Sequence, residues 1–169
     1  MYLDTVGLVT VGIGNMLPNA SVASVLAFVK RTTKARATPS EIQGDFVSVS
    51  KQPKGMAATW YRQFTTLDLP DIEVNNLFQK RIQEFQLQLL RAYPKYDTYP
   101  APAQLAMLDM AFNLGTGALK NRWPRLNDAI DQLDWKTAAE QCLRPTANAI
   151  RNAGTKALFV NASQSGTGR

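Results

Sequence analysis

The chain has 169 residues and a formal net charge of +6, with 19 Lys and Arg against 13 Asp and Glu, no histidine and one cysteine. A chain of this length buries enough surface to fold without disulfides or a structural metal. The absence of histidine and the lone Cys142 exclude Ser-His-Asp and Cys-His nucleophilic sites and zinc sites of the Cys/His type. Acid–base chemistry must therefore come from carboxylates, Lys, Tyr or the thiol, and we expect neither a metal nor a cofactor.

The positive charge favours polyanionic surroundings, such as nucleic acid, an anionic membrane or polymers of the bacterial envelope. The densest basic run, residues 30–36, lies between apolar segments, and we interpret it as a solvated connector. A basic nucleic-acid binder rests on net charge alone, because no aromatic–basic platform accompanies it, and we expect no nucleic-acid partner. No stretch reaches the ~18 consecutive apolar residues that cross a bilayer, so we expect no membrane span.

The two ends of the chain differ in character. The start has no basic segment followed by an apolar one, which argues against a signal peptide. Residues 1–4 resemble the interior of a structured element, which predicts that the chain is a fragment of something longer. Residues 162–169 are mostly small and polar and predict a flexible tail.

The first third of the chain predicts a hairpin and short helices. Residues 2–14 read as a β-hairpin, because residues 8–11 are rich in β-branched side chains and a turn falls near residues 4–7. Residues 20–30 carry apolar side chains at helical spacing, which predicts a helix.

A capping box predicts the next helix. Thr38-Pro39-Ser40-Glu41 has the required spacing, with proline at the first helical position. Pro53-Lys54-Gly55 ends this helix, and residues 56–64 predict another turn or two.

The clearest helix follows Pro70 and runs to about Tyr93, where Pro94 ends it. An amphipathic stripe covers about six turns of this helix. The stripe consists of Leu77, Phe78, Ile82, Phe85, Leu89 and Leu90. A long helix between two composition regimes predicts a strut that joins two lobes.

The last part of the chain reads as a helical lobe. Ala103–Leu114 is apolar nearly all round, which predicts a core helix that ends at Gly115. Asp109 lies within it and must be either exposed on a narrow polar side or paired, and a structural role is favoured over a catalytic one. Three further helices are predicted at Pro124–Leu133, Trp135–Leu143 and Asn148–Asn161. Trp135 and Cys142 are expected to be buried.

Polar groups converge in the hairpin beside glycine-rich backbone. Asp4, Thr5 and Thr10 alternate so that their side chains can meet on one side. A carboxylate beside a threonine hydroxyl can hold a water molecule, although such a pair is also common turn chemistry.

Residues 2–15, YLDTVGLVTVGIGN, resemble the catalytic hairpin of the phage-type lysozymes, glycoside hydrolase family 24. The resemblance resumes over residues 69–115 and continues through residues 134–139 to 151–159, so that about 110 residues are covered in order. Residues 17–66 do not align with the compact phage enzymes. This longer segment and the Arg151-Asn152 pair resemble lysozyme-like domains of bacterial type VI secretion effectors.

The resemblance implies an α+β, predominantly α, lysozyme-like fold. A small lobe with the hairpin (residues 1–66) would be followed by the long helix and a helical lobe (residues 67–161) and the tail. Asp4 falls on the catalytic Asp of the family and Thr10 on its active-site Thr. Asn15, Asn113 and Arg151 are the implied substrate-binding residues. Asn15 stands where the family usually has His.

The general acid of the family is a Glu nine residues before the Asp, a position that precedes Met1 here. None of the four glutamates, Glu41, Glu73, Glu84 and Glu140, comes before residue 41. Glu41 is explained by the capping box and Glu73 by the first helical turn, where negative charge is favourable. We therefore expect an upstream segment to supply the acid, since hydrolysis needs a proton donor as well as a carboxylate that guides water.

The resemblance implies a muramidase that hydrolyses the β-1,4 bond between N-acetylmuramate and N-acetylglucosamine in peptidoglycan. It further implies an antibacterial effector domain delivered to the periplasm, with an immunity protein as partner. The alternative is a non-catalytic module that keeps the lysozyme fold and binds peptidoglycan or an inhibitor, because the acid is absent from this chain.

Overall fold

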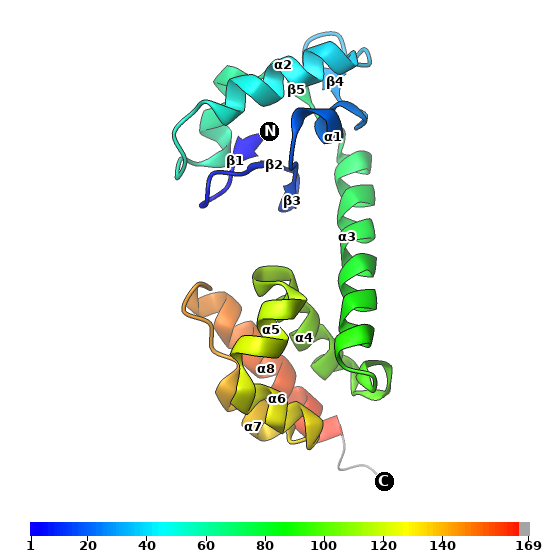
Figure 1. The fold of residues 1–169 in the computed structure, drawn as a ribbon, viewed down its shortest axis with the longest axis vertical. Helices are drawn as coiled ribbons and strands as arrows, with labels where there is room; N and C mark the ends of the chain where they lie inside the picture. The colour runs from blue at the N-terminus through cyan, green and yellow to red at the C-terminus, as the bar shows by residue number, and fades with distance from the viewer. Residues whose placement is uncertain (166–169) are drawn as a thin grey trace. The chain divides into compact units, whose positions relative to one another are not determined.

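The computed structural model describes residues 1–165 and is predominantly helical, with two small antiparallel sheets (Figure 1). Helices account for 62% of the chain and strands for 7%, which confirms the α+β, predominantly α, class. The chain forms two compact units, unit 1 from Met1 to Arg81 and unit 2 from Ile82 onward. Helix α3 (Asp71–Ala92) runs from one into the other. The division therefore falls inside this helix and not at residue 66, where the first predicted lobe ends.

A three-stranded sheet forms the start of unit 1. Strands β1 (Tyr2–Leu3), β2 (Val9–Val11) and β3 (Asn15–Met16) are antiparallel in the order β1-β2-β3. The expected hairpin is present, and β3 extends it. Gly12 makes the turn into β3 with φ of +57°, and a Cβ there would come within 2.8 Å of a methyl carbon of Val74 on α3. Only glycine satisfies both conditions.

The helix expected over residues 20–30 is correct only for its first part. Helix α1 (Ala20–Ser24) ends after five residues, and Val29–Lys30 form strand β4, which pairs with β5 (Leu67–Asp68). Phe28 is buried, and its carbonyl accepts a hydrogen bond from Ala37 N. Pairing with a distant strand and burial of Phe28 outweigh the helical spacing, which is a weak local preference.

The capping-box helix is present as α2 (Pro39–Ser50). Thr38 Oγ1 accepts a hydrogen bond from Glu41 N at 3.3 Å, and Glu41 Oε2 accepts one from Thr38 N at 2.9 Å. A 3₁₀ helix, η1 (Ala58–Phe64), follows where one or two turns were expected. The core of unit 1 is formed by Leu3, Val9, Val11, Leu17, Ala23, Phe28, Ala37, Ile42, Val49, Tyr61 and Leu67.

Asp45 ties α2 to the second sheet. Its buried carboxylate accepts hydrogen bonds from the backbone amides of Thr66 at 2.9 Å and Leu67 at 3.0 Å. These two amides would otherwise lack partners at the start of a short strand, so the carboxylate replaces a missing neighbour.

The basic run of residues 30–36 is an ordered turn. Lys30 N donates to Ala35 O, and Lys34 N donates to Lys30 O. The guanidinium of Arg31 donates to Asp68 Oδ1 at 3.2 Å and to Thr65 Oγ1 at 3.0 Å. Arg31 therefore holds the turn against the end of β5 and is not simply solvated.

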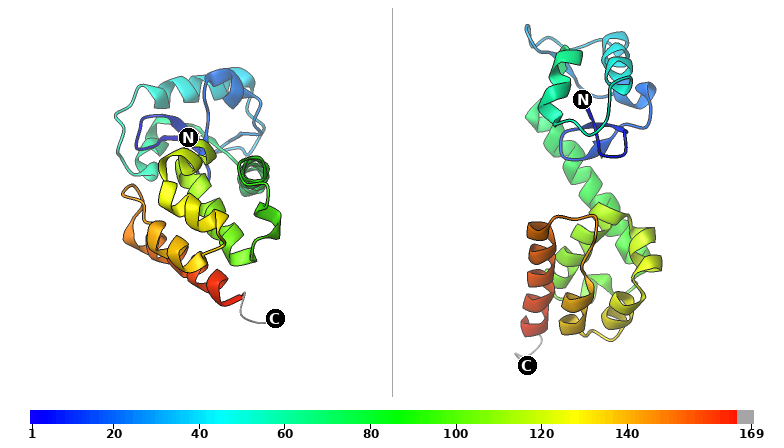
Figure 2. Two further views of the ribbon diagram at one scale, coloured as in Figure 1. Left: turned by 60° about the horizontal axis from the view of Figure 1, so that its bottom comes forward. Right: turned by 90° about the vertical axis from the view of Figure 1, so that its left-hand side faces the viewer.

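Unit 2 is helical. It contains the end of α3, η2 (Tyr96–Thr98), α4 (Ala101–Leu114), α5 (Thr116–Arg122), α6 (Pro124–Asp131), α7 (Trp135–Gln141) and α8 (Ala149–Ser165). Helices α4 and α8 pack side by side (Figure 2). The core helix and the three later helices were expected within a few residues, whereas α5 was not. Trp135 and Cys142 are buried, as expected.

The expected tail from residue 162 is incorrect for its first four residues. Helix α8 continues to Ser165, because Ala162 is fully buried against the core of unit 2. The rest of that predicted tail, residues 166–169, lies outside the described residues. Within residues 1–165, no helix has the length and apolar character that a bilayer crossing requires.

Candidate functional site

Asp4 directly follows β1 and anchors the turn of the hairpin. Its Oδ1 atom accepts hydrogen bonds from the backbone amides of Val6 at 3.0 Å, Gly7 at 2.9 Å and Leu8 at 2.8 Å. Short polar side chains that bond to amides ahead of them in this way are typical of tight turns. The other oxygen, Oδ2, forms no hydrogen bond with a described residue, so one half of the carboxylate stays available.

Thr10 lies in β2 and is only 2% exposed. Its hydroxyl donates to the carbonyl oxygen of Leu8 at 3.1 Å, and the same carbonyl accepts a hydrogen bond from Asp4 N at 3.0 Å. The structure therefore brings Asp4 and Thr10 together through the backbone of Leu8. Because the hydroxyl proton of Thr10 is used, Oγ1 is left as a hydrogen-bond acceptor.

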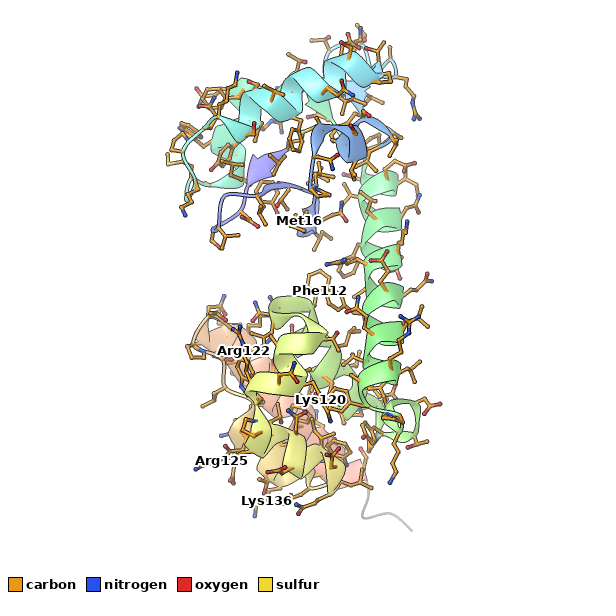
Figure 3. The ribbon with its side chains drawn as sticks, viewed as in Figure 1. Met16, Phe112, Lys120, Arg122, Arg125 and Lys136 are labelled. Carbon is orange, nitrogen blue, oxygen red and sulfur yellow. The ribbon has the colours of Figure 1, made fainter. Side chains whose placement is uncertain are left out.

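The register of the sheet separates Asn15 from this pair. Thr10 is paired with Tyr2 on one side and Met16 on the other, whereas Asn15 is paired with Val11. Directly opposed residues share a face and successive residues alternate, so Asn15 lies on the opposite face from Thr10. Met16, labelled in Figure 3, is 44% exposed on the face of Thr10.

No second carboxylate of unit 1 is bonded to the hairpin. Glu41 is engaged by Thr38 and by Lys30 Nζ at 2.7 Å; its pKa falls to about 2 because of the bond to Lys30 and then those to Thr38. Asp45 accepts hydrogen bonds from the amides of Thr66 and Leu67, and Asp68 accepts one from Arg31. Asp71 and Glu73 lie in the first turn of α3. Among residues 1–165, no cluster of three or more acidic or cysteine side chains could hold a metal ion.

Asp109 of α4 is paired, one of the two arrangements expected for it. Arg151 Nε of α8 donates to its Oδ1 at 2.8 Å, while Arg144 and the Thr155 hydroxyl each donate to Oδ2 at 2.7 Å. Burial acts to raise the pKa of Asp109, but the hydrogen bonds from Arg151, Thr155 and Arg144 outweigh it and hold the pKa below its usual 3.8.

Arg144 has the features of a site residue, and the sequence did not indicate it. Its side chain is fully buried, and its Nε atom has no hydrogen-bond partner among the described residues. Two guanidinium groups thus share the single carboxylate of Asp109. The available signal was indirect: an acid on an apolar helix requires a partner, but nothing in the local pattern identifies a residue 35 positions away.

The predicted substrate-binding residues of unit 2 lie around this ion pair. Asn113 is one helical turn after Asp109 on α4, and its Oδ1 is buried without a hydrogen bond to any residue from 1 to 165. Arg151 is engaged by Asp109 and keeps 37% of its side chain exposed. A cavity of about 440 Å³ adjoins Asp109 and Arg151. Asp4, Thr10 and Asn15 belong to unit 1, and Asn113 and Arg151 to unit 2.

Comparison with protein-family models, curated proteins and solved structures finds no match for this chain. The geometry of the hairpin and of the Asp109 network is therefore the basis for the functional conclusion.

Asp109 forms a hydrogen-bonded network with Arg144, Arg151 and Thr155. Substitutions of Asp109 and Arg151 should lower the free energy of unfolding by different amounts. Asp109→Asn should lower the free energy of unfolding by about 3–5 kcal/mol, because it leaves the buried Arg144 without a counterion. Arg151→Gln should cost about 1 kcal/mol or less, because this guanidinium is partly exposed to water. Urea titrations at pH 7 measure both values.

The pH dependence has a definite sign. A carboxyl whose pKa is lowered by folding stabilises the protein above its usual pKa and loses that contribution as the pH falls through the folded value. The difference between wild type and Asp109→Asn should therefore shrink below about pH 3.8. Equal, small costs for the two variants would show that Asp109 does not neutralise Arg144.

Proposed function

We propose that this chain is a lysozyme-type muramidase domain that acts on the β-1,4 bond between N-acetylmuramate and N-acetylglucosamine in peptidoglycan. The observation that carries the proposal is that Asp4 and Thr10 both hydrogen-bond to the peptide of Leu8, Asp4 to its amide and Thr10 to its carbonyl oxygen. Asp4 Oδ2 has no hydrogen-bond partner among the described residues. The resemblance of residues 2–15 to the catalytic hairpin of phage-type lysozymes supports it. The net charge of +6 suits a polyanionic wall.

The hairpin can orient a water molecule with two acceptors. One hydrogen of the water is donated to Asp4 Oδ2 and the other to Thr10 Oγ1, whose own proton is held by Leu8 O. A lone pair of the water oxygen then points away from the protein toward the anomeric carbon. As the water attacks, the carboxylate takes up its proton, which is the general-base half of an inverting mechanism.

The other half of the reaction is protonation of the leaving oxygen, for which an inverting enzyme uses a second carboxyl group ~6.5–9.5 Å from the first. None of the other carboxylates of unit 1 hydrogen-bonds to the hairpin. The proposal therefore assigns the water-positioning half to Asp4 and Thr10, and it assigns the proton donor to an upstream segment of the protein.

The wider role follows from the resemblance to type VI secretion effectors. We propose that the domain is delivered to the periplasm as an antibacterial toxin and that an immunity protein neutralises it. Asn113 and Arg151 are proposed to contact the glycan or its peptide.

A substrate whose leaving group needs no protonation tests the catalytic role of Asp4 in the absence of the general acid. We expect the chain to hydrolyse the 2,4-dinitrophenyl β-glycoside of the disaccharide N-acetylglucosaminyl-β-1,4-N-acetylmuramate, because dinitrophenolate departs without protonation. Asp4→Asn should reduce the rate by roughly 10²–10⁴, the usual contribution of a positioned base. Release of dinitrophenolate, followed by absorbance, measures both proteins.

Two features make this test specific. The Asn variant keeps an oxygen that can accept hydrogen bonds from the three turn amides, so it should still fold, with a lower unfolding midpoint because hydrogen bonds to a neutral oxygen are weaker. Asp134→Asn is the matched control, because Asp134 likewise accepts a backbone amide, that of Thr137, at the start of α7. Equal rates for wild type and Asp4→Asn would refute a catalytic role for Asp4.

One observation favours the alternative, a non-catalytic wall-binding module. The turn already satisfies Asp4 Oδ1 and the hydroxyl of Thr10, which is also what a purely structural turn would require. If this alternative is correct, the chain should sediment with purified peptidoglycan, release no muropeptides and leave the dinitrophenyl glycoside of the wall disaccharide intact. A chain that stays wholly in the supernatant would contradict it.

A further inference from the structure

Unit 2 contains a cavity of about 510 Å³ that belongs to neither candidate-site group. It is bordered by η2, the start of α4, the turn between α6 and α7, and the end of α8. Its volume falls within the ~300–1,000 Å³ range that is common for small-molecule sites.

The wall of the cavity is aromatic. Tyr99 and Trp135 line it with 6% and 7% of their surface exposed, and their ring centroids are 5.1 Å apart in an edge-to-face arrangement. Ala162 of α8 lies beside them and is fully buried. This wall offers a rigid apolar contact surface that costs little conformational entropy when a ligand binds.

Tyr99 differs from the other tyrosines in the use of its hydroxyl group. The other four donate hydrogen bonds, from Tyr2 to Gly12 O, Tyr61 to Pro53 O, Tyr93 to Asn127 Oδ1 and Tyr96 to Gln104 O. The Tyr99 hydroxyl forms no hydrogen bond within residues 1–165. Burial, and then the charge of Asp131, raise the pKa of Tyr99, so the phenol remains a proton donor at neutral pH.

Two lysines lie at the rim. Lys95 and Lys136 line the cavity, both are exposed, and neither forms an ion pair with a described residue. Figure 3 labels Lys136 near the start of α7. The one carboxylate of the lining, Asp134, is already bonded to the amide of Thr137 at 3.0 Å and to its hydroxyl at 2.6 Å. Hydrogen bonds from neutral donors leave the charge of Asp134 in place, so two lysines against one carboxylate give the lining a net charge of +1.

Leu133 completes the rim in a strained conformation. It follows α6 with φ of +58°, and the bonds Leu133 N to Ile130 O and Asp134 N to Ala129 O form the helix-ending pattern in which glycine is preferred. A leucine here is strained relative to glycine, because its Cβ crowds the neighbouring carbonyl oxygen at positive φ. Its side chain is 51% exposed and lines the cavity, so the fold gains little from it.

We propose that this cavity binds a small amphipathic anion, with an apolar body against Tyr99, Trp135 and Leu133. Its single anionic group accepts hydrogen bonds from the Tyr99 hydroxyl and lies between the ammonium groups of Lys95 and Lys136. The chemistry calls for one sulfonate, carboxylate or phosphate on an aromatic or short aliphatic body. This binding site is independent of the proposed wall hydrolysis.

Two dyes with the same ring system test the proposal on the full chain. 1-Anilinonaphthalene-8-sulfonate carries the anion, and N-phenyl-1-naphthylamine lacks it. Fluorescence titration should give one saturable sulfonate site that binds roughly tenfold or more tighter than the neutral dye, as expected for hydrogen bonds to a charged group. No saturable site, or equal affinity for both dyes, would overturn the proposal.

Substitutions locate the site. Lys95→Gln with Lys136→Gln should remove the preference for the sulfonate, whereas Arg91→Gln with Lys156→Gln, which removes the same charge from exposed positions outside the lining, should not. An equal loss in both double variants would show that only net charge attracts the dye and would refute the site.

Two further variants separate binding from stability. Tyr99→Phe should weaken sulfonate binding severalfold and leave the urea midpoint unchanged, because the hydroxyl has no hydrogen-bond partner among residues 1–165. Leu133→Gly should raise the urea midpoint, because glycine relieves the positive φ, and should weaken the binding of both dyes. Undiminished dye affinity in both variants would contradict the proposal.

Discussion

Asp4 Oδ1 accepts hydrogen bonds from the backbone amides of three consecutive residues, and the candidate site depends on this one atom. Hydrogen bonds to a charged acceptor each contribute about 1.5–3 kcal/mol, so an oxygen that receives three of them holds its side chain in one position. The bonds also set the distance from Asp4 to β2, because the amide of Leu8 is one of the three. The hydroxyl of Thr10 donates a hydrogen bond to the carbonyl oxygen of Leu8, which fixes the hydroxyl relative to the carboxylate.

A carboxylate that accepts several hydrogen bonds also holds unit 2 together, where α4 packs against α8. A buried guanidinium is costly unless a carboxylate and hydrogen-bond acceptors meet it, and Asp109 and Thr155 supply these to Arg144. Arg151 approaches the same carboxylate from the solvent side. Because two cations share one anion, the network keeps a local excess of positive charge beside the cavity that adjoins Arg151.

Local signals in the sequence predicted the elements whose stability is itself local. The capping box before α2, the stripe and Pro70 and Pro94 around α3, and the turn residues of the hairpin all act over a few positions, and each corresponds to an observed element. The helix expected after Ser24 failed because β4 takes its hydrogen bonds from β5, almost forty residues away. The end of α8 was missed because burial of Ala162 is a tertiary effect that local polarity does not reveal.

The candidate site divides in the same way. Asp4 and Thr10 are close in sequence, and the hairpin that contains both was predicted from turn and strand signals; each is hydrogen-bonded to the peptide of Leu8. Asn15 was assigned to the site by resemblance, whereas the register of β3 turns it to the other face. Arg144 and the Tyr99 cavity could not be predicted, because each is assembled from helices that are distant along the chain.

The central claim is that Asp4 and Thr10 direct a water molecule, and not a protein nucleophile, at the anomeric carbon. The stereochemistry of the first product tests it most directly. Proton NMR spectra recorded during hydrolysis of the 2,4-dinitrophenyl β-glycoside of N-acetylglucosaminyl-β-1,4-N-acetylmuramate should show the α-anomer of the disaccharide first, because a water that attacks opposite the leaving group inverts the configuration. Initial appearance of the β-anomer, or no hydrolysis at all, would contradict the account.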